Sequence, residues 1–129
     1  MPKETESKRL RKLALIADDE PIIGATLVEI LQTEGYDAIC VSDGESALFW
    51  AKFARPDFVI ADVVMPRLNG AELAKQLSSA LPEVRIILFS GHPGSTEILE
   101  KAAADGWKFE VLSKPIRPEV LIERMAAKA

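Results

Sequence analysis

LALIADDE (residues 13–20) is a short apolar run that ends in three acids, Asp18, Asp19 and Glu20. The apolar part predicts a buried β-strand. Two carboxylates about 4 Å apart repel each other by roughly 4 kcal/mol at an effective dielectric near 20. Three acids at the tip of a buried strand therefore predict that a positively charged group binds there.

Strand-like and helix-like segments alternate along the rest of the chain. Apolar runs recur at 36–41, 57–63, 84–90 and 109–113, and their Val, Ile and Leu content is typical of strands covered on both faces. Apolar residues at helical spacing lie between and after these runs. The predicted helices carry the following sets: Ile23, Leu27, Ile30 and Leu31; Ala47, Leu48, Ala51 and Ala54; Leu73, Leu77 and Leu81; Ile98, Leu99, Ala102 and Ala103; Val120, Leu121, Ile122 and Met125.

This alternation predicts an α/β fold, a doubly wound five-stranded parallel sheet with helices on both faces. Right-handed crossovers leave few topologies, and the flavodoxin-like strand order 2-1-3-4-5 is a common one for five strands. In that order the first and third strands are neighbours, and the winding reverses between them. Ligands bind outside the carboxyl ends of the strands at such a reversal.

Length and composition are those of one globular domain. The chain has 129 residues, is 48% hydrophobic and has a net charge of −4, which gives no support for a nucleic-acid-binding surface. We interpret residues 1–11 as a basic, solvated tail and residues 12–129 as the domain. The tail has no aromatic residue and no apolar face, which argues against a nucleic-acid or membrane arm.

No stretch approaches the ~18 apolar residues that span a bilayer, and we find no secretory signal. We therefore expect a cytoplasmic protein. The single cysteine, Cys40, excludes an internal disulfide and a cysteine-built metal site. Because Cys40 lies in a strand-like run, we predict a buried packing role for it.

Polar residues that end other predicted strands extend the acidic site. Asp62 ends the third strand, so it should share the sheet edge of Asp18 and Asp19, and clustered carboxylates suit Mg²⁺. The alternative is that these acids only cap the helix that begins near Pro21, but capping requires one acid and does not explain Asp62.

Ser90 and Lys114 follow the fourth and fifth strands. Taken singly, each is typical of a surface residue. Together with the acids and a metal ion, a hydroxyl and an ammonium describe a pocket for phosphoryl transfer.

These residues resemble the response-regulator receiver domains of two-component signalling, over roughly residues 12–128. Asp18 and Asp19 match the acidic pair of that family, and Asp62 within DVVMPRLNG matches the phosphoacceptor. Ser90-Gly91 match the switch hydroxyl and its small neighbour, and Lys114-Pro115 match the lysine–proline pair. Each motif alone is weak, but their order along the chain is specific.

The resemblance implies a phosphorelay switch rather than an enzyme with turnover on other substrates. Asp62 would accept a phosphoryl group from a histidine kinase or a histidine phosphotransfer protein. The implied roles are as follows: Asp18, Asp19, Asp62 and the backbone of Val64 bind Mg²⁺; Ser90, Lys114 and the backbone amides near Val63 and Gly91 bind the phosphoryl group; Val64 and His92 tune its lifetime; and the Lys114–Pro115 peptide bond is often cis.

The resemblance also places an effector-binding face on the fourth helix, the fifth strand and the fifth helix. The charged residues expected on it are Glu100, Lys101, Lys108 and Arg117. One departure from the family is Val111, which stands where a switch aromatic is usual. Phe109 would replace that aromatic only if the fifth strand had a bulge.

Two rival functions are open at this point. A phosphatase of the haloacid-dehalogenase kind also uses an aspartyl phosphate, Mg²⁺ and a lysine, but it requires an acid where this chain has Val64. An unphosphorylated interaction module on the same fold would not require the intact acidic set. His92, the only histidine, is interpreted as a surface loop residue rather than a phosphodonor or a metal ligand.

Overall fold

The computed structural model describes residues 10–127. Strands and helices alternate as predicted, and their bounds are β1 (Leu13–Ala17), α2 (Pro21–Thr33), β2 (Asp37–Val41), α3 (Gly44–Ala54), β3 (Phe58–Asp62), α4 (Gly70–Ala80), β4 (Arg85–Ser90), α5 (Ser95–Ala104), β5 (Glu110–Ser113) and α6 (Pro118–Ala126). No described helix is long and apolar enough to cross a membrane.

All strand pairs are parallel, and the sheet order is β2-β1-β3-β4-β5, which confirms the predicted topology. The register aligns Ala17, the last residue of β1, with Val41 and Ala61 on its two neighbours. The residues that follow these positions, Asp18 and Asp62, therefore leave the same edge of the sheet. Ser90 likewise aligns with Ser113, which precedes Lys114.

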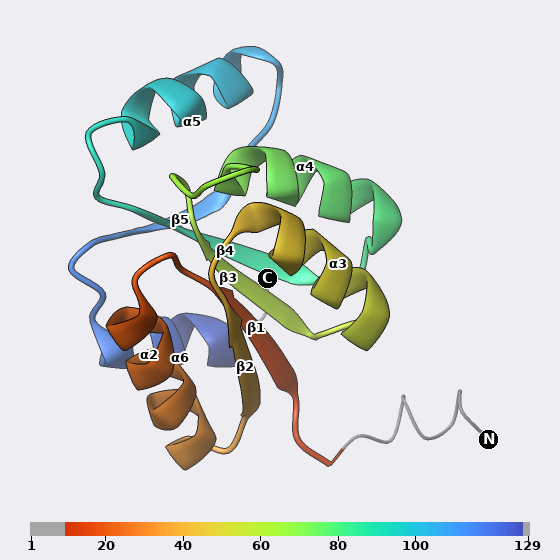
Figure 1. Ribbon diagram of the computed structural model, residues 1–129, viewed down its shortest axis with the longest axis vertical. Coiled ribbons are helices and arrows are strands. Elements are labelled where there is room, and N and C mark those ends of the chain that lie inside the picture. The colour runs from red at the N-terminus through yellow and green to blue at the C-terminus, as the bar shows by residue number, and fades with distance from the viewer. Residues whose placement is uncertain (1–9, 128–129) are drawn as a thin grey trace.

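Helices cover both faces of the sheet (Figure 1), with α2 and α6 on one face and α3, α4 and α5 on the other. Alternate residues of each strand supply the two cores. In β3, Val59 packs in the core under α3 and α4, while Ile60 packs in the core under α2 and α6. This two-sided burial explains why the central strands are continuous apolar runs.

Side chains define where two of the helices begin. The Ser46 amide donates to Asp43 Oδ1 at 2.7 Å at the start of α3. The Glu72 amide donates to Asn69 Oδ1 at 2.9 Å at the start of α4. Both bonds satisfy amides that have no partner inside the first turn of a helix.

The edge strands are less buried than the sequence indicated. Cys40 lies on edge strand β2 and is exposed, so the prediction of a buried Cys40 was wrong. Its sulfur still packs against α2, because a Cβ atom at Gly24 would collide with Cys40 Sγ. This partial burial, followed by the charge of Asp18, raises the pKa of the thiol.

The proposed basic tail, residues 1–11, lies largely outside the described residues. Its last residue, Arg11, donates to the Gln32 carbonyl at 2.7 Å and to the Gly35 carbonyl at 2.9 Å. This end of the tail therefore contacts the carboxyl end of α2 instead of being fully solvated.

Candidate functional site

Three carboxylates converge at the carboxyl edge of the sheet. One oxygen from each of Asp18, Asp19 and Asp62 lies within 4.8 Å of the other two. Asp18 follows β1, Asp62 is the last residue of the neighbouring β3, and the two are only 3% and 7% exposed, whereas Asp19 is exposed. These oxygens fit the preference of Mg²⁺ for hard ligands, and the exposed Asp19 leaves an access route from solvent.

Lys114 places one ammonium among these acids. Its Nζ lies 2.7 Å from Asp62 Oδ1 and 2.9 Å from Oδ2, so it engages both oxygens. Asp18 Oδ2 and Glu20 Oε1 are farther away, at 3.7 and 3.8 Å. A single lysine does not neutralise four acids, which leaves the site able to accept a further cation.

The surroundings shift the pKa values of both partners upward. Burial is the main cause that raises the pKa of Asp62 to about 6, and the charge of Asp18 adds to it, while Lys114 opposes the shift. For Lys114, burial disfavours the charged form, but Asp62, Asp18 and Glu20 together outweigh it and raise the pKa. The ammonium is therefore charged near neutral pH, and Asp62 is mainly ionised there and becomes protonated as the pH falls through about 6.

The helix-capping alternative does not account for these acids. Glu20 is the N-cap residue of α2, but its side chain makes no capping hydrogen bond. Asp18 Oδ1 instead accepts a hydrogen bond from the Glu20 amide at 2.8 Å. That bond uses one oxygen of Asp18 and orients the other toward the site, where it approaches Lys114.

Ser90 is held by a partner that the sequence did not indicate. Ser95 Oγ donates to the His92 carbonyl at 2.7 Å, and the two serine hydroxyls lie 2.8 Å apart. Since a hydroxyl carries one hydrogen, Ser90 must be the donor to Ser95. Ser90 therefore has to release Ser95, the buried first residue of α5, before it can donate to a ligand at Asp62.

Gly91 makes room for the lysine. A Cβ atom at Gly91 would lie 2.5 Å from Lys114 Cβ, which is closer than such atoms pack. A larger residue would displace the Lys114 side chain from Asp62. Gly91 thus has a steric role in addition to any role of its amide.

The expectation for the Val63 amide requires correction. This amide donates to the Phe89 carbonyl at 3.0 Å as a continuation of the sheet, and the Val63 carbonyl accepts from Gly70 at 2.8 Å. Among the described residues, no hydrogen bond engages the amides of Val64 or Gly91. These two amides, rather than that of Val63, are available to a ligand.

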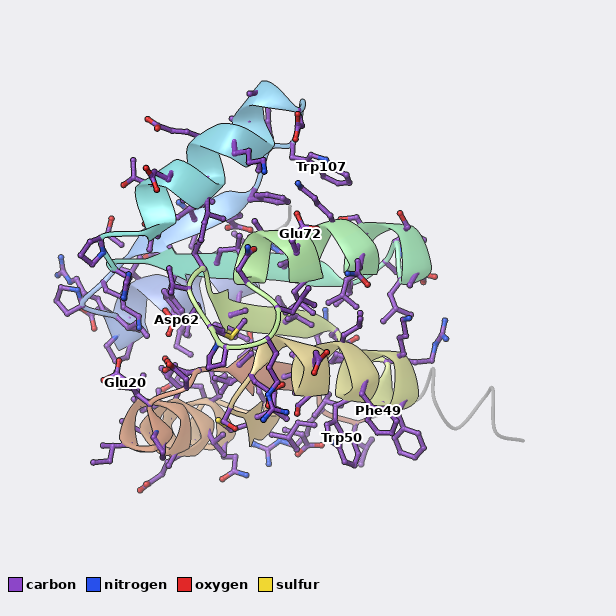
Figure 2. All side chains as sticks on the ribbon, turned by 45° about the horizontal axis from the view of Figure 1, so that its top comes forward. Glu20, Phe49, Trp50, Asp62, Glu72 and Trp107 are labelled. Atoms are coloured by element: carbon purple, nitrogen blue, oxygen red, sulfur yellow. The ribbon has the colours of Figure 1, made fainter. Side chains whose placement is uncertain are left out.

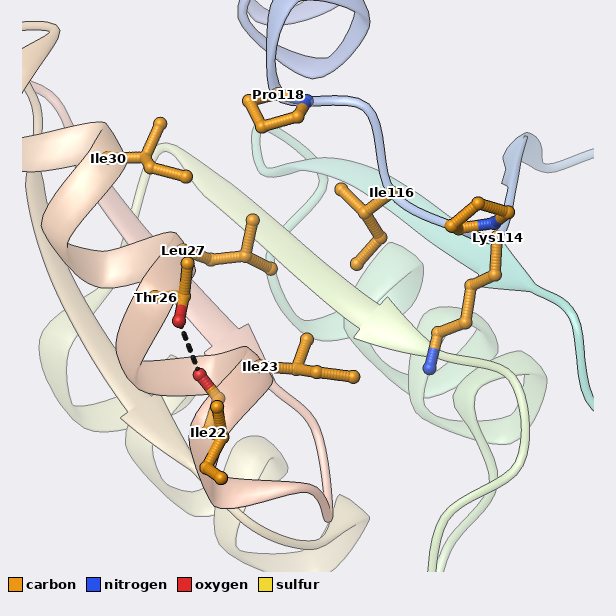
Figure 3. Close-up of a pocket in the computed structure, with 9 residues that line it drawn as sticks. Ile22, Ile23, Thr26, Leu27, Ile30, Lys114, Ile116 and Pro118 are labelled. Atoms are coloured by element: carbon orange, nitrogen blue, oxygen red, sulfur yellow. Dashed lines mark hydrogen bonds between the residues drawn. The ribbon is translucent and has the colours of Figure 1, made fainter.

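The stem of Lys114 borders an apolar groove between α2 and the segment that leads into α6 (Figure 3). The groove has a volume of about 280 Å³. Its lining residues are Ile22, Ile23, Thr26, Leu27, Ile30, Lys114, Pro115, Ile116 and Pro118. Apolar surface therefore lies directly beside the charged pocket. The Lys114–Pro115 peptide bond, which the resemblance implied is often cis, is cis.

No bulge brings an aromatic ring to the position of Val111. The β4–β5 register pairs Leu88 with Val111 and Ser90 with Ser113 without an inserted residue. Phe109 instead stacks on Trp107, with ring centroids 6.0 Å apart and an interplanar angle of 17°. The suggested substitution of Phe109 for the switch aromatic is therefore not supported.

His92 lies in the exposed loop before α5, as expected. Its Nδ1 accepts a hydrogen bond from the Gly94 amide at 3.1 Å, which ties the ring to its own loop. Gly94 also lies beside Val64, since a Cβ atom at Gly94 would be 3.8 Å from Val64 Cγ2 and 3.5 Å from His92 Nδ1. Val64 and His92, the two residues predicted to affect the lifetime of the phosphoryl group, therefore both lie next to Gly94.

Residues 14–126 match the model of the family described as response regulator receiver domain. The chain belongs to this family. Its receiver domain is 30% identical over 122 residues to the DNA-binding response regulator MtrA of Mycolicibacterium smegmatis, which covers 92% of this chain and 51% of MtrA. It is 34% identical over 113 residues to the response regulator MprA of Mycolicibacterium vanbaalenii, with coverage of 88% and 48%.

Among solved structures, the chemotaxis response regulator CheY4 of Vibrio cholerae matches the receiver domain with a TM-score of 0.75 and 31% identity. The match covers 89% of this chain and 96% of CheY4. The chain spans about half the length of the curated relatives MtrA and MprA. The family, its fold and its place in two-component signalling are thereby shown.

Proposed function

We propose that this receiver domain accepts a phosphoryl group on Asp62 from a phosphohistidine of a kinase or phosphotransfer protein, in a reaction that requires Mg²⁺. The observation that carries the proposal is the contact of Lys114 Nζ with both oxygens of Asp62 beside Asp18 and Asp19. In this arrangement the carboxylate can attack a phosphoryl group, while the ammonium and a bound cation neutralise the charge of the phosphoryl oxygens.

In the proposed reaction an Asp62 oxygen attacks the phosphorus, the P–O bond forms, and the P–N bond to the histidine of the partner breaks. Asp18, Asp19, Asp62 and the Val64 carbonyl would hold Mg²⁺, which when bound supplies positive charge to the phosphoryl oxygens. Lys114 Nζ would bind an oxygen of the transferred phosphoryl group as a point charge. The free amides of Val64 and Gly91 would donate to the remaining oxygens.

The apolar groove beside Lys114 supports this choice of donor. A protein that carries a phosphohistidine has to approach Asp62 across this edge of the molecule, and the groove offers it apolar contact next to the acceptor. A small phosphate ester would gain nothing from such a surface.

Incubation with acetyl phosphate and Mg²⁺, followed by intact mass measurement, tests the proposed function. A phosphoacceptor gains the mass of one phosphoryl group and keeps it through the measurement. Continuous release of phosphate without accumulation would identify a phosphatase. An unchanged mass would identify an inert interaction module, and either result would overturn the proposal.

Mg²⁺ affinity should weaken as the pH falls through about 6, because Asp62 is protonated below its raised pKa of about 6 and a protonated carboxyl is a poor metal ligand. We expect the apparent affinity to fall by up to about tenfold per pH unit below that value. Titration calorimetry with Mg²⁺ between about pH 5 and about pH 8 measures this. In Asp62→Asn the affinity should be weaker and this dependence should flatten, and an equally steep dependence in that variant would contradict the assignment.

We further propose that the phosphorylated domain binds its effector through α5, β5 and α6. Glu100, Lys101, Lys108 and Arg117 are all exposed on these elements or the segments that join them. Release of Ser95 by Ser90 would act directly on the first turn of α5, which connects the pocket to this face. Exposed charges of both signs suit a reversible interface.

Beryllofluoride with Mg²⁺, used as a phosphoryl mimic, should shift the backbone amide signals of Glu100, Lys101, Lys108 and Arg117 in NMR spectra. The reason is that the mimic competes for the Ser90 hydroxyl and loosens the bond to Ser95. Asp62→Asn is the control and should show none of these shifts. Shifts confined to the loops around Asp62 would contradict the proposed effector face.

A further inference from the structure

Three aromatic side chains lie on the outer surface of α3. Phe49, Trp50 and Phe53 are 62%, 40% and 72% exposed. Their ring centroids lie 5.5 Å apart for Phe49–Trp50, 6.3 Å for Phe49–Phe53 and 5.5 Å for Trp50–Phe53. They form one continuous surface, the α3 aromatic patch, and Figure 2 shows Phe49 and Trp50 projecting outward on the far side of the molecule from Glu20 and Asp62.

The core does not require these rings. The fully buried residues of α3 are the small ones, Gly44, Ala47 and Ala51. A single exposed apolar side chain is normal, but three aromatic rings in mutual contact form a contiguous apolar patch, a feature that marks interaction surfaces. The patch is also separate from the α5–β5–α6 face and from the groove beside Lys114.

Opposite charges lie before and after Phe49 along the same helix. Glu45 lies four residues before Phe49, and Lys52 lies three residues after it, so the two charges are about 10 Å apart along the axis. Neither side chain makes an ion pair within the part of the chain that the structure describes. The surface of α3 therefore carries a negative charge on the amino-terminal side of Phe49 and a positive charge on its carboxyl-terminal side, next to Phe53.

We propose that the α3 aromatic patch binds a second copy of this chain, with the two α3 helices antiparallel about a twofold axis near Phe49. A twofold axis brings the same patch of both copies together. In the antiparallel arrangement, Glu45 of each copy lies opposite Lys52 of the other. A parallel arrangement would instead place like charges opposite each other, which is unfavourable.

The size of the patch indicates a weak dimer. Rings of this size present about 350 Å² of exposed area per copy. Two copies together fall short of the roughly 1,200–2,000 Å² that stable interfaces bury, even with contributions from flanking residues. The dimer should therefore form with a dissociation constant above about 10 μM and be concentration-dependent.

Sedimentation velocity of the full chain, from about 10 μM to about 1 mM, tests self-association. We expect the weight-average mass to rise with concentration in the parent and to remain that of a monomer in Phe49→Glu. Ile22→Glu is the matched control, since it introduces the same charge at an exposed apolar residue of α2, and it should associate like the parent. Circular dichroism verifies that each variant is folded.

Charge reversal tests the antiparallel register independently of the rings. Glu45→Lys and Lys52→Glu should each associate at least about threefold more weakly than the parent, because each places like charges across the twofold axis. An equimolar mixture of the two variants should recover association, since Glu45→Lys then faces Lys52→Glu.

A parent that stays monomeric at about 1 mM would overturn the proposal and leave the patch to a different partner. Association that persists in Phe49→Glu would place the contact on another surface and would also overturn it. A mixture of the two charge variants that associates no better than either alone would refute the antiparallel pairing.

Discussion

Asp62→Asn should abolish phosphorylation by acetyl phosphate, with no mass gain under conditions in which the parent is fully labelled. The amide keeps the shape of the side chain but cannot act as the attacking oxygen of a carboxylate. Within the cation cluster of the described residues, Asp62 lies closest to Lys114 Nζ, at 2.7 Å, whereas Asp18 lies 3.7 Å from it. Intact mass spectrometry after incubation with Mg²⁺ and donor measures the loss.

Asp37→Asn is the matched control, because Asp37 is an exposed aspartate at the opposite end of the sheet from Asp62. It should be labelled like the parent. Persistent labelling of Asp62→Asn at another carboxylate would move the acceptor elsewhere and refute the assignment.

Asp62→Asn should not destabilise the fold. Between its usual pKa of 3.8 and about 6, Asp62 binds more protons in the folded than in the unfolded chain, so stability from this group falls as the pH rises through that window. At neutral pH the ionised carboxylate is therefore a cost to folding. Asp62→Asn removes that charge and leaves Lys114 with Asp18 and Glu20.

The sequence predicts the sheet and the site together because the same segments carry both. The strand from Phe58 to Asp62 is buried along its whole length, so its apolar residues mark a central strand. Asp62, the polar residue at its end, therefore lies at the carboxyl edge of the sheet. Lys114 lies at the same edge because it directly follows Ser113, the last residue of β5. Convergence of these side chains follows from topology alone.

Groups whose role depends on their hydrogen-bond partners could not be predicted in this way. Ser95 holds Ser90 through a hydroxyl contact that no spacing rule indicates. The Val63 amide was assigned by resemblance, but the β3–β4 hydrogen-bond ladder extends one residue beyond Asp62 and engages that amide. Cys40 was predicted as buried from its apolar run alone, although the predicted strand order 2-1-3-4-5 already places the second strand at an edge of the sheet.

Apolar periodicity also could not predict the α3 aromatic patch. Ala47 and Ala51 at helical spacing define the buried side of α3, and this pattern is complete without any aromatic residue. Phe49 and Phe53 raise the apolar content of the segment and so strengthen the helix prediction, while the structure places them on the outside. Apolar periodicity predicts the buried side of a helix but does not reveal when its outer side also carries apolar rings.

The phosphoryl group on Asp62 should be long-lived, and Val64→Asn or Val64→Glu should accelerate its loss by about tenfold, a change of about 1.4 kcal/mol in the barrier. Val64 is half-buried two residues after the acceptor and offers no polar atom from its side chain. We therefore expect it to shield the phosphorus of a phosphorylated Asp62 without orienting an attacking water. An amide or carboxylate at this position could hold that water by a hydrogen bond.

His92→Ala should change the lifetime by less than about twofold. The Nδ1 atom of His92 accepts a hydrogen bond from the Gly94 amide at 3.1 Å, so this face of the ring is already engaged by its own loop. The measurement is the loss of the phosphoryl mass after donor removal, timed in parallel for the parent and the three variants. Val64→Ile is the control that keeps the shield apolar, and it should decay like the parent. Slow decay in both polar variants, or a pronounced slowing in His92→Ala, would show that Val64 is not the residue that governs access of water to the phosphoryl group.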